Sequence, residues 1–247
     1  MIPGERIDEF VKRIRDAGGP NLQSIILYGS AASGDFHSDL SDINLLCIVH
    51  DTSLRVLEAL APVIKWWTRR QPSSPLFMTR NELERSSDVF AIEFLDMRQR
   101  YRVLYGDDVL KDLDISMAHH RAQLEYELRE KLLLLRQKFL LLGSRERQLK
   151  ALLLESVPSF LTLFRHALIA LGDAPGDSKR ETVDRLARRL GFDPAAINQA
   201  LDARQHNRSL KSSDVRTVFA GYLATIEHVA TAVDTMLDSD KSAGSVR

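Results

Sequence analysis

The segment that most constrains the fold is residues 22–49, where two short apolar runs flank a polar loop. Leu22–Tyr28 is rich in Ile and Leu and stops at Gly29, which is typical of a buried strand that ends in a tight turn. Residues 43–49 have the length and the β-branched side chains of a second buried strand. We therefore expect two core strands, with the polar loop at one end of a sheet.

The polar loop carries groups that bind phosphate and metal ions. Gly29 lets the backbone approach a phosphate closely. Ser30 offers a hydroxyl and a backbone N–H at the expected start of a short helix, where free N–H groups favour anions. Asp42 and Asn44 are two positions apart, so on a strand both side chains project from one face. Oxygen ligands placed in this way can hold Mg²⁺ against a triphosphate, which indicates phosphoryl or nucleotidyl transfer.

The motif as a whole resembles that of the polymerase β-like nucleotidyltransferase superfamily. The resemblance rests on Gly29-Ser30, the polar loop, and Ser41-Asp42-Ile43 at the head of an apolar strand. It implies an NTP substrate, Mg²⁺ (or Mn²⁺) as cofactor, and transfer of a nucleoside monophosphate to a hydroxyl group. It also implies that Gly29 and Ser30 bind the nucleotide phosphates. The acceptor is open between a small molecule and a protein, and the sequence leaves a homodimer open.

The chain departs from the superfamily pattern at position 44. Asn44 stands where the superfamily has the second metal-binding carboxylate, and it offers only a neutral carbonyl oxygen. Charge stabilisation by the metal contributes several kcal/mol to such reactions. Two hypotheses therefore stay open. The chain is a nucleotidyltransferase with metal ligands Asp42, Asn44 and Glu93, or it is a catalytically impaired module that binds a nucleotide or a protein partner.

Glu93 enters this ligand set through a third apolar run, residues 89–97, which we expect to form a strand interrupted by Glu93 and Asp96. A carboxylate inside a buried strand is costly unless it is paired or binds a metal. The resemblance implies a third carboxylate on a later strand, and Glu93 is the first candidate for it, with Asp96 second. Asp42 and Glu93 are the expected catalytic residues. The alternative is that Glu93 lies on an exposed strand face or pairs with an arginine.

Three arginines follow this run at alternate positions: Arg98, Arg100 and Arg102. If the strand continues, they share one face. They would then form either a phosphate-binding rim or a charged edge strand that resists aggregation.

From Ile115 onward, the sequence pattern predicts helices. Helices are expected from Ser116 to about Leu142, from Ser144 to Leu171, from Lys179 to Leu190, after Asp193-Pro194, and from Ser212 or Ser213 to about Leu237. The predicted fold class is α+β: a mixed-sheet nucleotidyltransferase domain at 1–113, an all-α helical bundle domain at 114–240, and a flexible tail at 241–247.

Arg165 is the one bundle residue with a predicted functional role. It lies in the apolar segment SFLTLFRHALIAL, where a charged side chain needs a partner. It would either hold a triphosphate or an acidic substrate, or form an inter-helix salt bridge.

Composition narrows the partners. Lys+Arg and Asp+Glu both number 34, so no global basic charge indicates a nucleic-acid partner. Neither a signal-peptide core nor a leucine-rich stretch free of charges is evident, and a cytoplasmic protein without a membrane partner is expected. The histidines lack the spacing of a zinc site.

Overall fold

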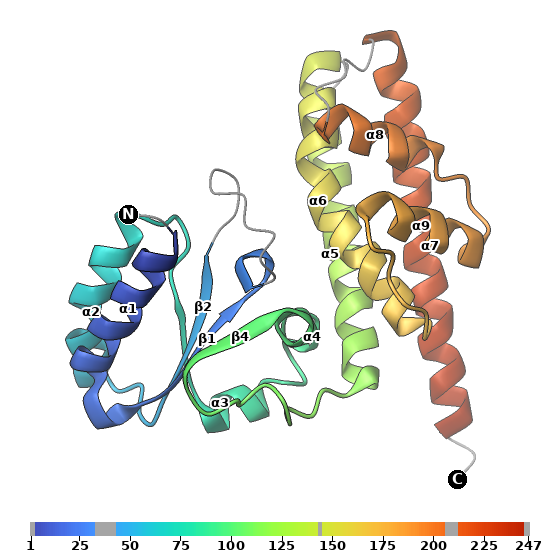
Figure 1. The fold of residues 1–247 in the computed structure, drawn as a ribbon. Coiled ribbons are helices and arrows are strands. Elements are labelled where there is room, and N and C mark those ends of the chain that lie inside the picture. Colours follow the sequence, from blue (N-terminus) through green and yellow to red (C-terminus); the bar gives the residue numbers. More distant parts are fainter. Residues whose placement is uncertain (1–2, 33–42, 143–144, 206–211, 245–247) are drawn as a thin grey trace. The chain divides into compact units, whose positions relative to one another are not determined.

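The computed structural model describes residues 3–32, 43–142, 145–205 and 212–244, and it divides into two compact units, Met1–Ser116 and Met117–Arg247 (Figure 1). The first unit holds the strands β1 (Leu22–Tyr28), β2 (Asn44–Val49), β3 (Leu76–Thr79) and β4 (Tyr101–Gly106). Within the described residues they form a four-stranded sheet in the order β3-β2-β1-β4. β1 is antiparallel to both β2 and β4, whereas β2 and β3 are parallel, so the sheet is mixed as predicted.

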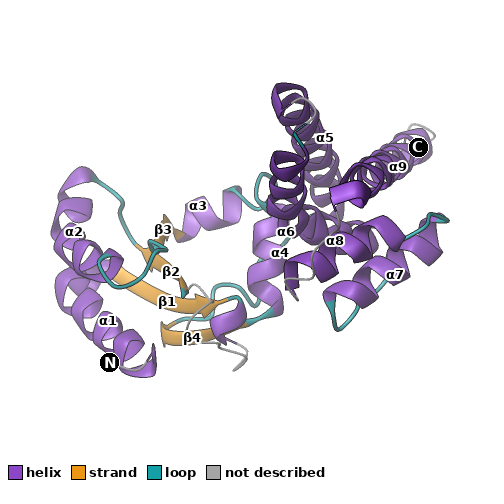
Figure 2. Cartoon of the chain, turned by 90° about the horizontal axis from the view of Figure 1, so that it is seen from above, coloured by secondary structure: helices purple, strands orange, loops and turns teal. Residues whose placement is uncertain are grey.

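Helices cover both faces of this sheet because its two central strands are apolar on both sides. The helices α1 (Pro3–Gly18) and α2 (Leu54–Thr68) lie on one side, as Figure 2 shows. Their Phe10 and Trp67 pack with Ile25 and Cys47 from the sheet. On the other side, the sheet residues Ile26, Leu46 and Ile48 pack with α3 (Arg80–Arg85) and α4 (Ala91–Gln99).

The strand predicted at residues 89–97 is wrong, because this segment forms helix α4. Ala91, Phe94 and Met97, spaced by three residues, are buried against the sheet. A short apolar run fits a buried strand and a buried helix equally well, and periodicity alone does not separate them. The shared strand face predicted for the three arginines is wrong for the same reason. Arg98 lies in α4, Arg100 follows it, and Arg102 lies on β4.

The second unit consists of the helices α5 (Met117–Leu142), α6 (Glu146–Ala170), α7 (Lys179–Leu190), α8 (Ala195–Gln205) and α9 (Ser212–Gly244). The long helices α5, α6 and α9 contact one another, and the shorter α7 and α8 pack on α6. The helical bundle is therefore confirmed, although α9 continues beyond the end predicted near Leu237.

The central helix of this bundle, α6, is long and apolar enough to cross a membrane by length and composition alone. However, 56% of its most apolar stretch is already buried inside the protein. Leu153, Val157 and Phe164 are fully buried, so this apolar surface forms the core of the helical unit.

Candidate functional site

The turn after β1 is built on Gly29, whose φ of +78° is a backbone conformation that glycine adopts readily. Its N–H donates to the Arg100 carbonyl at 2.9 Å, and its carbonyl accepts from the Ala32 N–H at 3.0 Å. The second bond closes a single 3₁₀ turn, Ser30–Ala32, where the sequence predicted the start of a short helix. Ser30 is exposed on this turn.

Asn44, the first residue of β2, lies beside Gly29, which directly follows β1. It pairs with Tyr28 in the register between β1 and β2. A Cβ atom on Gly29 would lie 3.3 Å from the Asn44 Nδ2 atom, so the absence of a side chain at position 29 makes room for this amide. The structure therefore brings together two of the residues predicted for the site, Gly29 and Asn44. Asp42 and most of the polar loop lie outside the described residues.

Asn44 shares a sheet face with Leu46 and Ile48, because side chains alternate along a strand. This is the face that α4 covers. Glu93 projects from α4, but it is exposed, in contrast to Ala91 and Phe94 on the buried side of the helix. Glu93 is therefore not the buried strand carboxylate that the sequence predicted. Glu93 stays a candidate metal ligand. It lies on α4, and this helix packs over the sheet face that includes Asn44.

Two tyrosines lie in the same row of paired residues as Asn44, one on β1 and one on β4, and the sequence did not predict either of them as part of the site. Tyr28 pairs with Asn44 on one side and with Tyr101 of β4 on the other. Burial raises the pKa of Tyr28. Burial also raises the pKa of Tyr101, and so does the Asp108 carboxylate, which accepts a 2.9 Å hydrogen bond from its hydroxyl. Both phenols therefore stay neutral well above pH 7. The place of Tyr28 directly before Gly29-Ser30 was the available signal.

The three arginines do not share a strand face, but their segment makes a contact that shapes the Gly29 turn. Arg98 donates to the Leu113 carbonyl at 3.0 Å, a bond that links α4 to the segment after β4. The backbone carbonyl of Arg100 receives the Gly29 N–H. Arg102 is exposed on β4, opposite Leu27. The segment thus holds the Gly29 turn through its backbone.

Arg165 belongs to the second unit, where it is partly buried on α6. Its Nη2 atom lies 3.2 Å from Nε2 of His166, and Nδ1 of His166 lies 2.9 Å from Nε2 of His120 on α5. Both imidazoles are fully buried. Because a guanidinium can only donate, Nε2 of a neutral His166 must accept, and its Nδ1–H must donate to His120. Arg165 thus fixes the tautomer of a buried histidine pair.

Of the described residues in the predicted ligand set, Asn44 is the one that the structure places beside the Gly29 turn. Asn44 can supply one neutral carbonyl oxygen. Across residues 3–32, 43–142, 145–205 and 212–244, no three His, Cys, Asp or Glu side chains lie close enough together to hold a metal ion. Asp42, the acidic residue of the motif that was predicted to bind the metal, lies outside these ranges.

Comparison with known proteins indicates a family for the first unit of the chain. A family model described as "Nucleotidyltransferase domain" matches residues 7–101, which contain β1, β2, the Gly29 turn and Asn44. Residues 7–101 thus match a nucleotidyltransferase domain, which supports the resemblance to the polymerase β-like superfamily. Comparison with curated proteins found no matching sequence.

The nucleotidyltransferase domain and the helical unit together resemble a solved enzyme. Spectinomycin adenyltransferase AAD(9) from Enterococcus faecialis, crystallised with ATP and spectinomycin, matches 94% of this chain and 99% of its own. The TM-score is 0.60 and the sequence identity 15%, so the likeness is one of fold. A nucleotidyltransferase-like protein from Exiguobacterium sibiricum 255-15 matches 92% of this chain and 75% of its own, with 16% identity and a TM-score of 0.36.

Proposed function

We propose that this protein transfers a nucleoside monophosphate from an NTP to a hydroxyl group of a small-molecule acceptor, with Mg²⁺ as cofactor. The observation that carries the proposal is the Gly29 turn with Asn44 directly beside it, inside the segment that matches the nucleotidyltransferase family. AAD(9), which shares the fold, was crystallised with ATP and a small-molecule acceptor, and this supports a small molecule over a protein as acceptor.

The phosphate-binding role falls to Gly29 and Ser30. A glycine with positive φ exposes backbone that a side chain would cover, so phosphate oxygens can approach it closely. The exposed Ser30 adds a hydroxyl donor on the same turn. Arg165 belongs to the helical unit, where its guanidinium donates to His166, and the phosphate-binding role expected for it stays a prediction.

The metal would be held by Asp42 and the carbonyl oxygen of Asn44, with Glu93 as a third candidate ligand. The bound ion would neutralise charge on the triphosphate. The acceptor hydroxyl oxygen forms a bond to the α-phosphorus, and the bond from that phosphorus to the bridging oxygen of the β-phosphate breaks. Pyrophosphate leaves with the electron pair. The hydroxyl proton passes to a carboxylate, for which Asp42 and Glu93 are the candidates.

The test is release of pyrophosphate from each of the four NTPs with Mg²⁺, across a panel of hydroxyl-bearing small molecules that includes aminocyclitols. We expect turnover with at least one pair, and we expect Asp42→Ala to reduce it about a hundredfold or more, because several kcal/mol of stabilisation are lost. Asp88→Ala is the matched control, since Asp88 is an exposed aspartate of the same unit outside the motif. Absence of turnover with every pair would contradict the proposal.

A second candidate function is nucleotide binding without turnover, and Asn44 is the observation that favours it. An amide at this position contributes no charge to a metal site. Asn44→Asp separates the two candidates. If the site is a weakened metal site, the new carboxylate should raise Mg²⁺-dependent NTP affinity by on the order of tenfold, measured by calorimetry with and without EDTA.

The control for this variant is Asn81→Asp, which adds the same charge at an exposed position on α3. Turnover that appears only in Asn44→Asp would establish that the natural chain binds without reacting. A folded Asn44→Asp variant with unchanged Mg²⁺ dependence would show that position 44 does not face the metal.

A further inference from the structure

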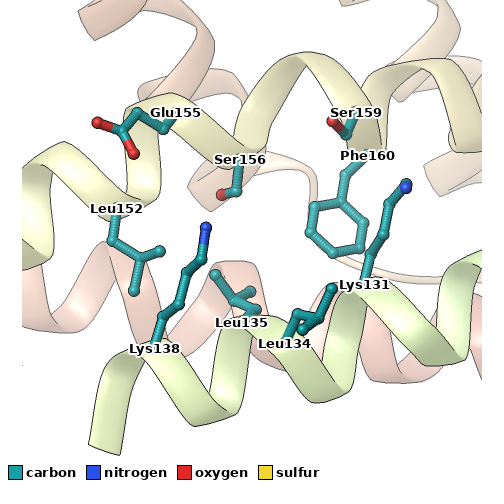
Figure 3. Close-up of a pocket in the computed structure, with 9 residues that line it drawn as sticks. All are labelled: Lys131, Leu134, Leu135, Lys138, Leu152, Glu155, Ser156, Ser159 and Phe160. Carbon is teal, nitrogen blue, oxygen red and sulfur yellow. The ribbon is translucent and has the colours of Figure 1, made fainter. Parts of the chain in front are cut away.

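A groove in the helical unit has the chemistry of a ligand site, and it is independent of the nucleotidyltransferase domain. It lies between α5 and α6 and has a volume of about 170 Å³. Figure 3 shows side chains of both helices pointing into it. Every residue that lines it belongs to the second unit, so the groove is complete within that unit.

The floor of the groove is apolar. Leu135 of α5 and Leu152 and Phe160 of α6 line it, and each is at most 6% exposed. An apolar cavity of about 150 Å³ is large enough to bind benzene. The groove therefore has room for one aromatic ring or a short alkyl chain, with a small polar head group towards solvent.

The rim of the groove is positively charged. Lys131 and Lys138, seven residues apart on α5, both extend across the groove towards α6 (Figure 3). The Lys131 Nζ atom forms an ion pair with Glu127 Oε2 at 2.8 Å. Within the part of the chain that the structure describes, Lys138 makes neither a hydrogen bond nor an ion pair. Glu155 is the one acidic residue that lines the groove, and it lies at one end (Figure 3).

Two serine hydroxyls on α6 lie between the lysines, but only one has a hydrogen to donate. The Ser156 hydroxyl donates to the Leu153 carbonyl at 2.9 Å, so at its 3.0 Å contact with Tyr222 it must accept. Ser159 makes no hydrogen bond through its hydroxyl within the described residues and is exposed at the groove. The donors available to a ligand are therefore Lys138, Lys131 and Ser159, all suited to an anion.

We propose that this groove binds a small organic carboxylate that bears one aromatic ring or a short alkyl chain. Lys138 and Lys131 bracket the carboxylate, Ser159 donates to it, and the apolar part rests on Leu135 and Phe160. An inorganic phosphate would meet the same lysines but would leave the apolar floor uncovered, so the floor favours the organic anion.

The experiment is a titration of the full chain with benzoate at low ionic strength, followed by two-dimensional NMR. We expect saturable shifts at α5 and α6 with a Kd of roughly 1 mM, the range that one ring and two exposed ion pairs support. Benzyl alcohol, which keeps the ring, and inorganic phosphate, which keeps the charge, should each bind at least about fivefold more weakly.

The variants Lys138→Met and Ser159→Ala should each weaken benzoate binding about threefold to fivefold without changing the fold, because both side chains are exposed. Lys150→Met is the matched control, since Lys150 lies on α6 outside the groove. Equal binding of benzyl alcohol would show that the charges do not act on the ligand. Equal binding of phosphate would show an anion site without an organic part. Unchanged affinity in Lys138→Met, or no saturation below 50 mM benzoate, would also overturn the proposal.

Discussion

At the scale of single residues, the geometry of the candidate site depends on the absence of a side chain at position 29. Because Gly29 has no side chain, the Asn44 amide can lie against its backbone. The sequence predicted both residues from their spacing in the motif. It did not predict that the Gly29 N–H is held by the carbonyl of Arg100, because that bond joins positions 71 residues apart in the sequence. Contacts of this kind depend on the packing of β4 beside β1.

Arg165 illustrates the same limit, since its apolar sequence context predicted a need for a partner but could not name one. One partner is the next residue, His166, which in turn contacts His120 on another helix. We predict that both histidines carry their proton on Nδ1, because Arg165 forces Nε2 of His166 to accept. Long-range ¹H–¹⁵N spectra of the histidine rings measure this directly.

Arg165→Met should release that preference and lower the free energy of unfolding by about 1 kcal/mol, since one hydrogen bond from a charged group to a buried acceptor is lost at a partly exposed site. Arg147→Met, at an exposed position on the same helix, is the control. A protonated Nε2 on His166 in the unmodified protein would contradict the assignment. A large loss of NTP affinity in Arg165→Met would instead favour its predicted role in phosphate binding.

At the scale of elements, helices with clear start and stop signals were predicted well. Helix α7 begins after Ser178, whose hydroxyl accepts from the Glu181 N–H at 3.1 Å, and it ends at Gly191 with φ +75°. Both residues are the types that helix termini favour. Residues 89–97 have neither signal: α4 begins after Phe90 without a side-chain cap. No local sequence signal therefore argued against a strand at these residues. For the same reason, none argued against a buried position for Glu93.

The capping hydrogen bond of α7 gives a prediction at this scale. Ser178→Ala should destabilise the helical unit by about 1 kcal/mol and speed hydrogen exchange at the Glu181 amide, because that N–H loses its acceptor. Ser178→Asp should restore both, since aspartate is an equally good N-cap and its charge suits the helix N-terminus. The two variants are compared by urea denaturation and by exchange. Equal behaviour of Ala and Asp would contradict the assigned role of the hydroxyl.

At the scale of the whole molecule, the α+β architecture could be predicted because the hydrophobic pattern of the sequence changes after β4. Alternating apolar runs and turns occupy the first unit, and long helical patterns occupy the second. The likeness to AAD(9) over 94% of the chain shows that this order of sheet unit and helical unit recurs at 15% identity. Chemistry was harder to predict than fold, because it depends on single side chains such as Asn44 that leave the fold unchanged.

We propose that the Gly29 turn and Asn44 form the phosphate and metal site of a nucleotidyltransferase. The most direct test is a crystal structure of the full chain with a non-hydrolysable NTP analogue and Mn²⁺, with the metal located by its anomalous signal. We predict phosphate oxygens at the Gly29-Ser30 turn and at least one Mn²⁺ within bonding distance of the Asn44 side chain or Asp42. A nucleotide bound away from this turn, or Mn²⁺ with no ligand from either residue, would contradict the claim.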